Sequence, residues 1–173
     1  MPEKPTSWLE DHAGELPRGG MALDLACGKG RHALWLAERG YQVKAFDRDR
    51  AALSFLSDQA KARQLAIEPV CVDLEQPGFR VSPSAFDVIV VVNYLHRSLF
   101  PELVNALRPG GVLIYETFTM AQAQRGRPTN PAFLLEPGEL ARLVTPLAIV
   151  AAREGLYDDR EIASIVARRS DTA

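Results

Sequence analysis

Apolar runs of strand length alternate with amphipathic segments along most of the chain. Polar residues or glycine bound each apolar run, which is typical of strands, and the segments between them mix apolar with charged residues as surface helices do. The predicted strands are 21–26, 41–47, 67–73, 86–92 and 111–118, and the predicted helices between them are 32–39, 50–63 and 98–107. The continuous run of branched residues from Val88 to Val92 indicates a parallel strand covered on both faces.

The end of the chain breaks this alternation. Residues 147–154 and 161–169 are strand-like runs joined by GLYDDR, a connection too short to hold a helix, so they predict an antiparallel hairpin. The earlier alternation predicts right-handed crossovers and a parallel sheet. We therefore expect one domain over residues 1–173: an α/β fold with a doubly wound, mostly parallel seven-stranded sheet, a terminal antiparallel hairpin and an N-terminal helix within residues 1–18.

Composition and charge narrow the class of function. The 173 residues carry a net charge of −2 and no basic stripe, which argues against a protein that wraps nucleic acid and favours small-molecule chemistry. No apolar stretch is long enough for a membrane span or resembles a signal peptide, so a cytoplasmic protein without a membrane partner is expected. Cys27 and Cys71 lie in separate strand-like segments without metal-ligand spacing, and no metal site is expected.

The stretch LDLACGKGRHALWL places an acidic residue, Asp24, in an apolar strand just before a glycine-rich turn. Gly28 and Gly30 allow a sharp turn and a close approach of a ligand to the backbone. The amides of residues 29–32 then lie at a helix N-terminus, which favours negative charge. A ligand with both an ammonium and a carboxylate group, such as the methionine end of S-adenosylmethionine, would use both features.

A second interpretation of this turn is a dinucleotide site. Residues 28–33 also satisfy the pattern G-x-G-x-x-A, and Asp47 follows Gly28 by nineteen residues, as in nicotinamide-dependent oxidoreductases. Such an enzyme needs a substrate domain, for which 173 residues leave no room. The loose pattern therefore makes an oxidoreductase the alternative rather than the preferred interpretation.

The order of motifs along the chain resembles one family. The sequence DLACGKG at 24–30 closely resembles the first motif of class I S-adenosylmethionine-dependent methyltransferases. VKAFD at 43–47, VCVDLE at 70–75, FDVIVVVNYL at 86–95 and LRPGGVLIYETF at 107–118 resemble the later motifs of that family, in the right order. The resemblance covers nearly the whole chain, includes the terminal hairpin, and within the family is nearest to the small tellurite-resistance type.

The resemblance implies the cofactor and its contacts. S-adenosylmethionine would donate its methyl group to a small-molecule acceptor by in-line displacement and leave S-adenosylhomocysteine. Asp47 is expected to hold the ribose hydroxyls and Asp73 the adenine amino group, although Glu75 offers a second carboxylate nearby. The expected cofactor-binding residues are Asp24, Ala26, Gly28, Gly30, Arg31, Asp47, Arg48, Asp73, Leu74 and Asn93.

Catalytic residues are harder to assign, because positioning alone can supply most of the acceleration of a methyl transfer. Tyr94, His96 and Glu116 follow or end predicted strands and are the candidates, with a surface or packing role as the alternative. The sequence NYLH at 93–96 lacks the two prolines of some amine-methylating relatives, so amine methylation is not implied.

The segment 119–135 is long, irregular and polar, and we expect it to form a lid over the acceptor. Its donors Arg125, Arg127 and Asn130 predict an acceptor with anionic character, while a solvated loop is the alternative. A chain that binds the cofactor without catalysis is a further alternative, since a fold does not determine a function.

Overall fold

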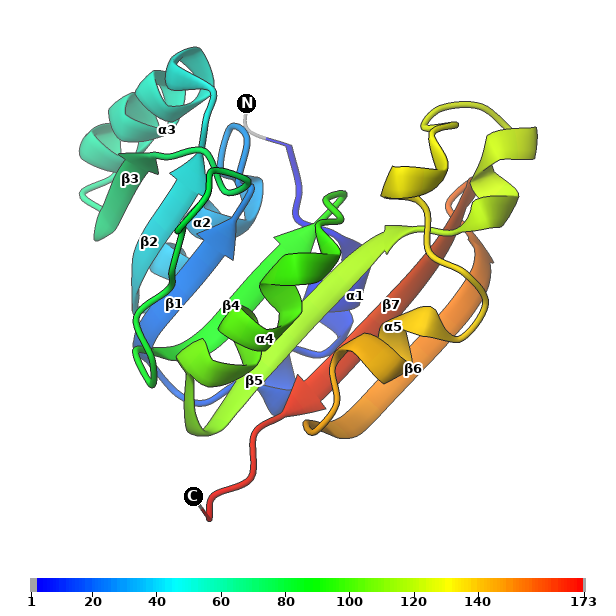
Figure 1. Ribbon diagram of the computed structural model, residues 1–173. Coiled ribbons are helices and arrows are strands. Elements are labelled where there is room, and N and C mark those ends of the chain that lie inside the picture. The colour runs from blue at the N-terminus through cyan, green and yellow to red at the C-terminus, as the bar shows by residue number, and fades with distance from the viewer. Residues whose placement is uncertain (1–2, 173) are drawn as a thin grey trace.

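The computed structural model describes residues 3–172 and contains a seven-stranded sheet with helices on both faces (Figure 1). The strands are β1 (Gly20–Leu25), β2 (Tyr41–Asp47), β3 (Ile67–Cys71), β4 (Phe86–Val92), β5 (Leu107–Phe118), β6 (Ala148–Tyr157) and β7 (Arg160–Arg168). The helices are α1 (Ser7–Asp11), α2 (Arg31–Glu38), α3 (Arg50–Ala62), α4 (Phe100–Ala106) and α5 (Glu139–Leu143). Short 3₁₀ turns lie at Ala13–Glu15, Arg97–Leu99, Met120–Gln124 and Pro131–Phe133.

The strand order is β3-β2-β1-β4-β5-β7-β6. β1 pairs in parallel with β2 and β4, and β4 with β5, whereas β7 lies antiparallel between β5 and β6. This arrangement confirms the predicted doubly wound sheet and its antiparallel hairpin.

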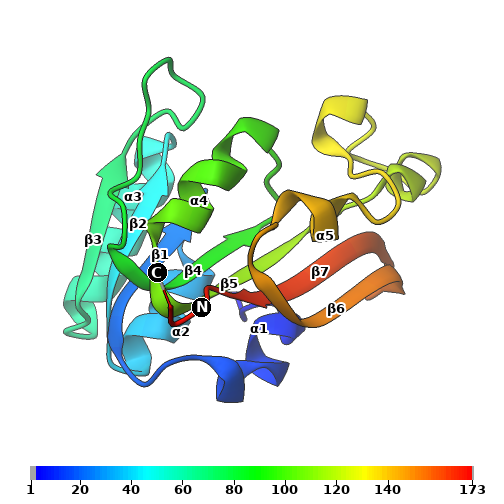
Figure 2. The same ribbon diagram turned by 60° about the horizontal axis from the view of Figure 1, so that its bottom comes forward.

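Two apolar layers hold the helices to the sheet. Figure 2 shows α4 and α5 on one face and α1 and α2 on the other. Leu103 of α4 and Leu140 of α5 pack with Leu23 and Ile89, whereas Leu36 of α2 packs with residues of the opposite face. The four residues Val88 to Val91 of β4 are all 0% exposed, as expected for a strand covered on both faces.

Some boundaries differ from the sequence-based expectation. The N-terminal helix is only the short α1 followed by a 3₁₀ turn, and β3 ends at Cys71, so Asp73 follows the strand rather than ending it. α5 was not predicted because its five residues bury only Leu140, which leaves no periodic pattern to detect. No helix within residues 3–172 is long and apolar enough to cross a membrane.

Candidate active site

The candidate site lies at the carboxyl ends of the central strands. β1 stands between β2 and β4, so the crossovers change direction there, and ligands of open α/β sheets bind at such a point. Two cavities of about 340 and 630 Å³ open at this edge and share Ala26, Asp47, Asn93 and Tyr94 in their walls. We call the two together the cleft.

The two glycines of the DLACGKG motif at 24–30 have different roles. Gly28 has φ +55° and lines the larger cavity, and nothing lies within 4 Å of the position that a Cβ atom would take. Gly30 has φ +82°, and a Cβ atom there would lie 2.4 Å from Cδ1 of Leu56. Gly28 therefore leaves room for a ligand, whereas Gly30 lets the start of α2 pack closely against α3.

Asp47 joins the end of β2 to the glycine turn. Its Oδ2 atom accepts a hydrogen bond of 2.8 Å from the Gly28 amide, and its Oδ1 atom accepts one of 2.9 Å from the Asp49 amide. Asp49 caps α3 by accepting from the amides of Ala51 and Ala52. The carboxylate of Asp47 lies in the walls of both cavities and is held in place by backbone donors.

Asp24 is 1% exposed and lies beneath the glycine turn rather than in the cleft wall. Its Oδ2 atom accepts a 3.0 Å hydrogen bond from the Ala33 amide in the first turn of α2. Burial raises the pKa of Asp24 to about 7, although the Ala33 bond and Arg31 act in the opposite direction. The Asp24 carboxyl group therefore binds the start of α2. A positive charge brought close to it would favour its ionised form.

Most of the predicted cofactor-binding residues lie together in the cleft wall: Ala26, Gly28, Arg31, Asp47, Arg48, Asp73, Leu74 and Asn93. Asp73 lies in the smaller cavity, and its Oδ1 atom accepts a 2.9 Å hydrogen bond from the Glu75 amide. Glu75 lines the same cavity, so the structure leaves both carboxylates as possible contacts. The other two, Asp24 and Gly30, do not line the cleft: Asp24 binds the Ala33 amide and Gly30 packs against Leu56.

Among the three catalytic candidates, Tyr94 lines both cavities. Its buried hydroxyl has no hydrogen-bond partner among the residues that the structure describes. Burial, with Glu75 and Asp73 nearby, raises the pKa of Tyr94 to about 12, so the phenol stays protonated at neutral pH. It is therefore suited to donate a hydrogen bond and not to act as a general base.

His96 and Glu116 are placed differently, and their positions do not support the sequence-based hypothesis of catalysis. Neither side chain belongs to the cleft wall. His96 lies 3.6 Å from a carboxylate oxygen of Glu75, in a contact at the surface. Glu116 is 0% exposed and fully occupied by hydrogen-bond and ionic partners in the interior, so a substrate proton cannot reach it.

The segment 119–135 is anchored at both ends. The buried side chain of Gln122 accepts a 2.9 Å hydrogen bond from the Glu161 amide and donates one of 3.0 Å to the carbonyl oxygen of Arg127. Arg97 donates a 2.9 Å hydrogen bond to the carbonyl oxygen of Leu134. The segment therefore has a defined path over the end of β5, as Figure 1 shows in yellow-green and yellow.

Pro128 and Phe133 are the residues of this segment that line the cleft. Arg125 lies 3.8 Å from Asp159 in the β6–β7 turn, and Asn130 accepts from the Ala132 amide to cap a 3₁₀ turn. None of Arg125, Arg127 and Asn130 belongs to the cleft wall. Their role in acceptor binding stays a prediction.

Several residues of the cleft wall were not singled out from the sequence: Glu3, Phe55, Leu95, Thr117, Phe118 and Phe133. Thr117 and Phe118 end the fifth strand, and the rule for ligands in α/β sheets could have found them. Glu3 and Phe133 reach the cleft through tertiary structure alone. Within residues 3–172, no group of three or more His, Cys, Asp or Glu side chains could hold a metal ion.

A comparison with known families matches residues 22–111, more than half of the chain, to the model of a methyltransferase domain. The chain is 31% identical over 120 residues to YqeM of Bacillus subtilis, a protein named as a candidate methyltransferase, covering 64% of this chain and 46% of that protein. It is 27% identical over 86 residues to TehB of Haemophilus influenzae, named a probable S-adenosyl-L-methionine-dependent methyltransferase, covering 50% of this chain and 30% of that protein. The chain thus spans less than half the length of these two relatives.

Solved structures show the same fold. The crystal structure of TehB from Haemophilus influenzae has a TM-score of 0.77 at 20% identity, over 95% of this chain and 62% of that one. An S-adenosylmethionine-dependent methyltransferase from Mesorhizobium loti has a TM-score of 0.75 at 20% identity, over 95% of this chain and 98% of that one. These comparisons confirm the predicted fold class and, with the domain match, the predicted family. The chain belongs to the methyltransferase domain family and has the fold of class I S-adenosylmethionine-dependent methyltransferases.

Proposed function

We propose that the protein transfers a methyl group from S-adenosylmethionine to a small-molecule acceptor. The observation that carries this proposal is the cleft, in which Asp47 binds the glycine turn and the two cavities join at Asn93 and Tyr94. The acceptor heteroatom attacks the methyl carbon as the bond to sulfur breaks, and the electron pair of that bond goes to sulfur. The products are the methylated acceptor and S-adenosylhomocysteine, and the acceptor loses its proton, if it carries one, to water.

The walls of the cleft suggest how the cofactor lies. The larger cavity, with Gly28 and Arg31, suits the methionine part, because backbone amides and a cation favour its carboxylate. Asp47 suits the ribose hydroxyls, and the smaller cavity near Asp73 and Leu74 suits the adenine. The methyl group would then emerge beside Asn93, where the two cavities meet.

The remaining wall of the smaller cavity suits the acceptor. Tyr94, Thr117, Phe118, Pro128 and Phe133 surround the space beyond Asn93 and are mainly apolar. We therefore propose that the segment 119–135 covers an acceptor with an apolar body, and that Pro128 and Phe133 contact it. The protonated Tyr94 hydroxyl, which lacks a partner within the described residues, is a candidate donor to the acceptor.

The first prediction concerns the cofactor class. Isothermal titration should show binding of S-adenosylmethionine and S-adenosylhomocysteine but not of NADH, and release of S-adenosylhomocysteine should appear in a screen of small thiols, phenols, amines and oxyanions. Tight binding of NADH without affinity for S-adenosylmethionine would establish the oxidoreductase alternative. Binding of S-adenosylmethionine without turnover on any acceptor would favour a binding module.

The second prediction concerns Asp47. Asp47→Ala should weaken S-adenosylmethionine binding by about 1.5–3 kcal/mol, the range for hydrogen bonds to a charged group, while the protein stays folded. Asp47→Asn is the matched control, because its amide oxygen can still accept from the Gly28 amide while the charge is lost. Calorimetric affinities measure both variants, and normal cofactor binding by a folded Asp47→Ala protein would contradict the ribose assignment.

The third prediction concerns the pH dependence of cofactor affinity. An ammonium group near Asp24 would lower its pKa from about 7 in the free protein, so binding releases a proton. Affinity for S-adenosylmethionine should therefore rise from pH 5.5 to pH 7, by on the order of tenfold, and fall again only where the cofactor's own ammonium group loses its proton, above about pH 8. Burial holds the pKa of His32 at about 3, so that residue does not titrate in this range.

Asp24→Asn is the control for this pH effect, because it keeps an acceptor for the Ala33 amide and cannot ionise. Titrations at several pH values should show a nearly pH-independent and weaker affinity for this variant. An Asp24→Asn protein with the same pH dependence as the wild type would show that another group titrates on binding.

The fourth prediction concerns the segment 119–135. Phe133→Ala should lower kcat/KM for the acceptor identified in the screen about tenfold, or about 1.4 kcal/mol of transition-state binding, with little change in cofactor affinity. The double variant Arg125→Ala, Arg127→Ala is the comparison: a kcat/KM within about threefold of the wild type would restrict the acceptor contacts to residues that line the cleft, which neither arginine does. A large loss in the double variant, with a normal Phe133→Ala protein, would instead support the anionic acceptor predicted from the sequence.

A further inference from the structure

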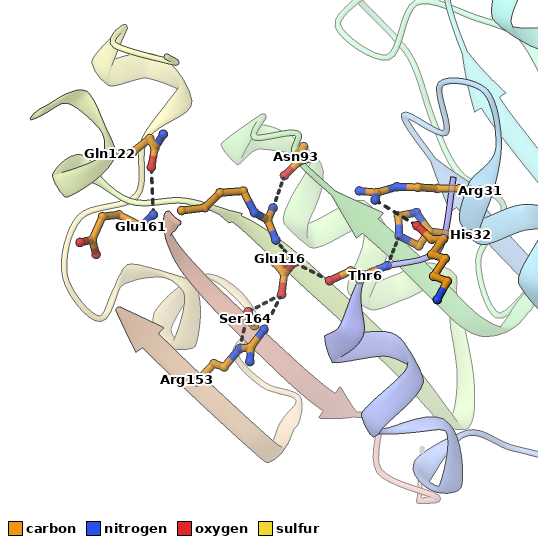
Figure 3. Close-up of polar contacts among 11 residues, drawn as sticks. Thr6, Arg31, His32, Asn93, Glu116, Gln122, Arg153, Glu161 and Ser164 are labelled. Atoms are coloured by element: carbon orange, nitrogen blue, oxygen red, sulfur yellow. Dashed lines mark hydrogen bonds and ion pairs between the residues drawn. The ribbon is translucent and has the colours of Figure 1, made fainter. Parts of the chain in front are cut away.

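Glu116 occupies a fully buried position in β5 and gathers side chains from distant parts of the chain (Figure 3). The hydroxyl groups of Thr6 and Ser164 each donate to it at 2.6 Å, to Oε1 and Oε2 respectively. Arg160 lies 3.3 Å from Oε1 and Arg153 lies 3.4 Å from Oε2. Two cations and two hydroxyl donors compensate a buried charge that would otherwise be costly.

On one side, this cluster fixes the N-terminal residues. The Thr6 amide donates a 3.1 Å hydrogen bond to Nε2 of His32, and both residues are buried. Arg31 donates a 3.2 Å hydrogen bond to the carbonyl oxygen of Lys4. We call residues 3–6 the N-terminal strap.

The strap reaches the cofactor end of the cleft. Glu3 lines the larger cavity together with Gly28, Arg31 and His32, so strap and glycine turn face the same space. Figure 1 shows this part of the chain at the edge of the sheet where β1 and β4 end. A molecule held in this cavity would therefore lie between the glycine turn and the strap.

On the other side, the cluster contacts the point where the two cavities join. Arg160 donates one hydrogen bond of 3.3 Å to Glu116 and another of 3.3 Å to Oδ1 of Asn93. Asn93 has φ +59°, an uncommon conformation for a residue other than glycine, and lies in the walls of both cavities. Glu116 thus contacts the strap directly through Thr6, and only Arg160 lies between it and Asn93, the residue beside the expected methyl group.

We propose that Glu116 is a positioning residue that couples the N-terminal strap to Asn93. When Thr6 is bound to Glu116, the strap covers the methionine part of the cofactor, and the same carboxylate orients Arg160 against Asn93. Release of the Thr6 hydroxyl frees the strap and alters the support of Asn93. This proposal rests on the proposed function, because it assumes that S-adenosylmethionine occupies the larger cavity.

The structure offers a matched pair of variants. Thr6→Val and Ser164→Ala each remove one hydroxyl donor at 2.6 Å from the same carboxylate, but only Thr6 belongs to the strap. We expect Thr6→Val to raise the dissociation rate of S-adenosylmethionine about tenfold, equivalent to about 1.4 kcal/mol, and Thr6→Ser to restore the wild-type rate. Ser164→Ala should keep the wild-type dissociation rate, even where it lowers the thermal stability to a similar extent.

NMR of the ligand-free protein tests the coupling without the cofactor. In Thr6→Val, the backbone amide of residue 6 should exchange faster with solvent, and the side-chain amide resonances of Asn93 should shift. In Ser164→Ala, both signals should stay as in the wild type.

The outcomes separate the two proposals. Equal effects of Thr6→Val and Ser164→Ala on dissociation, or unchanged Asn93 resonances in Thr6→Val, would overturn the coupling and leave Glu116 as part of the interior packing. A wild-type protein that does not bind S-adenosylmethionine would overturn the proposed function, and the amide exchange and Asn93 resonances would still decide whether strap and Asn93 are coupled.

Discussion

The hydrogen bond from the Gly28 amide to the carboxylate of Asp47 joins the turn after β1 to the end of β2. Both cavities are built around this contact, because Asp47 lines each of them and the turn forms the wall of the larger one. The turn can adopt its path because Gly28 has a positive φ and Gly30 accepts the close approach of Leu56. Without these constraints the helix α2 would not start beside the cleft, where Arg31 and His32 line the larger cavity.

Three acidic residues of the central strands show how burial determines the role of a carboxyl group. Asp47, at a strand end, keeps access to the cleft. Asp24 is buried against one backbone amide, and burial raises its pKa to about 7. Glu116 is buried as deeply but has two arginine partners, Arg153 and Arg160, which compensate its charge. Acidic side chains thus line the cleft, bind the start of a helix and form an interior cluster.

The end of the cleft that we assign to the acceptor is built from parts of the chain that are far apart in sequence. Phe118 comes from the end of β5, while Phe133 arrives after a long segment that Gln122 and Arg97 hold in place. Arg125 belongs to the same segment as Phe133 but pairs with Asp159 in the β6–β7 turn. Such contacts are set by tertiary structure, so the sequence alone could not show which side chains of the segment line the cleft.

The sequence by itself determined the mostly parallel sheet, the terminal hairpin and most of the residues around the glycine turn that line the cleft, because hydrophobic periodicity and the glycine turn are local and the motifs occur at strand ends. It could not show that Asp24 binds the Ala33 amide or that Gly30 packs against Leu56, since the packing of α2 and α3 brings these partners together. The roles of Glu116 and of residues 3–6 were also decided only by the tertiary structure. Their contacts join positions 110 residues apart, and no local pattern records which distant donor will meet a buried carboxylate.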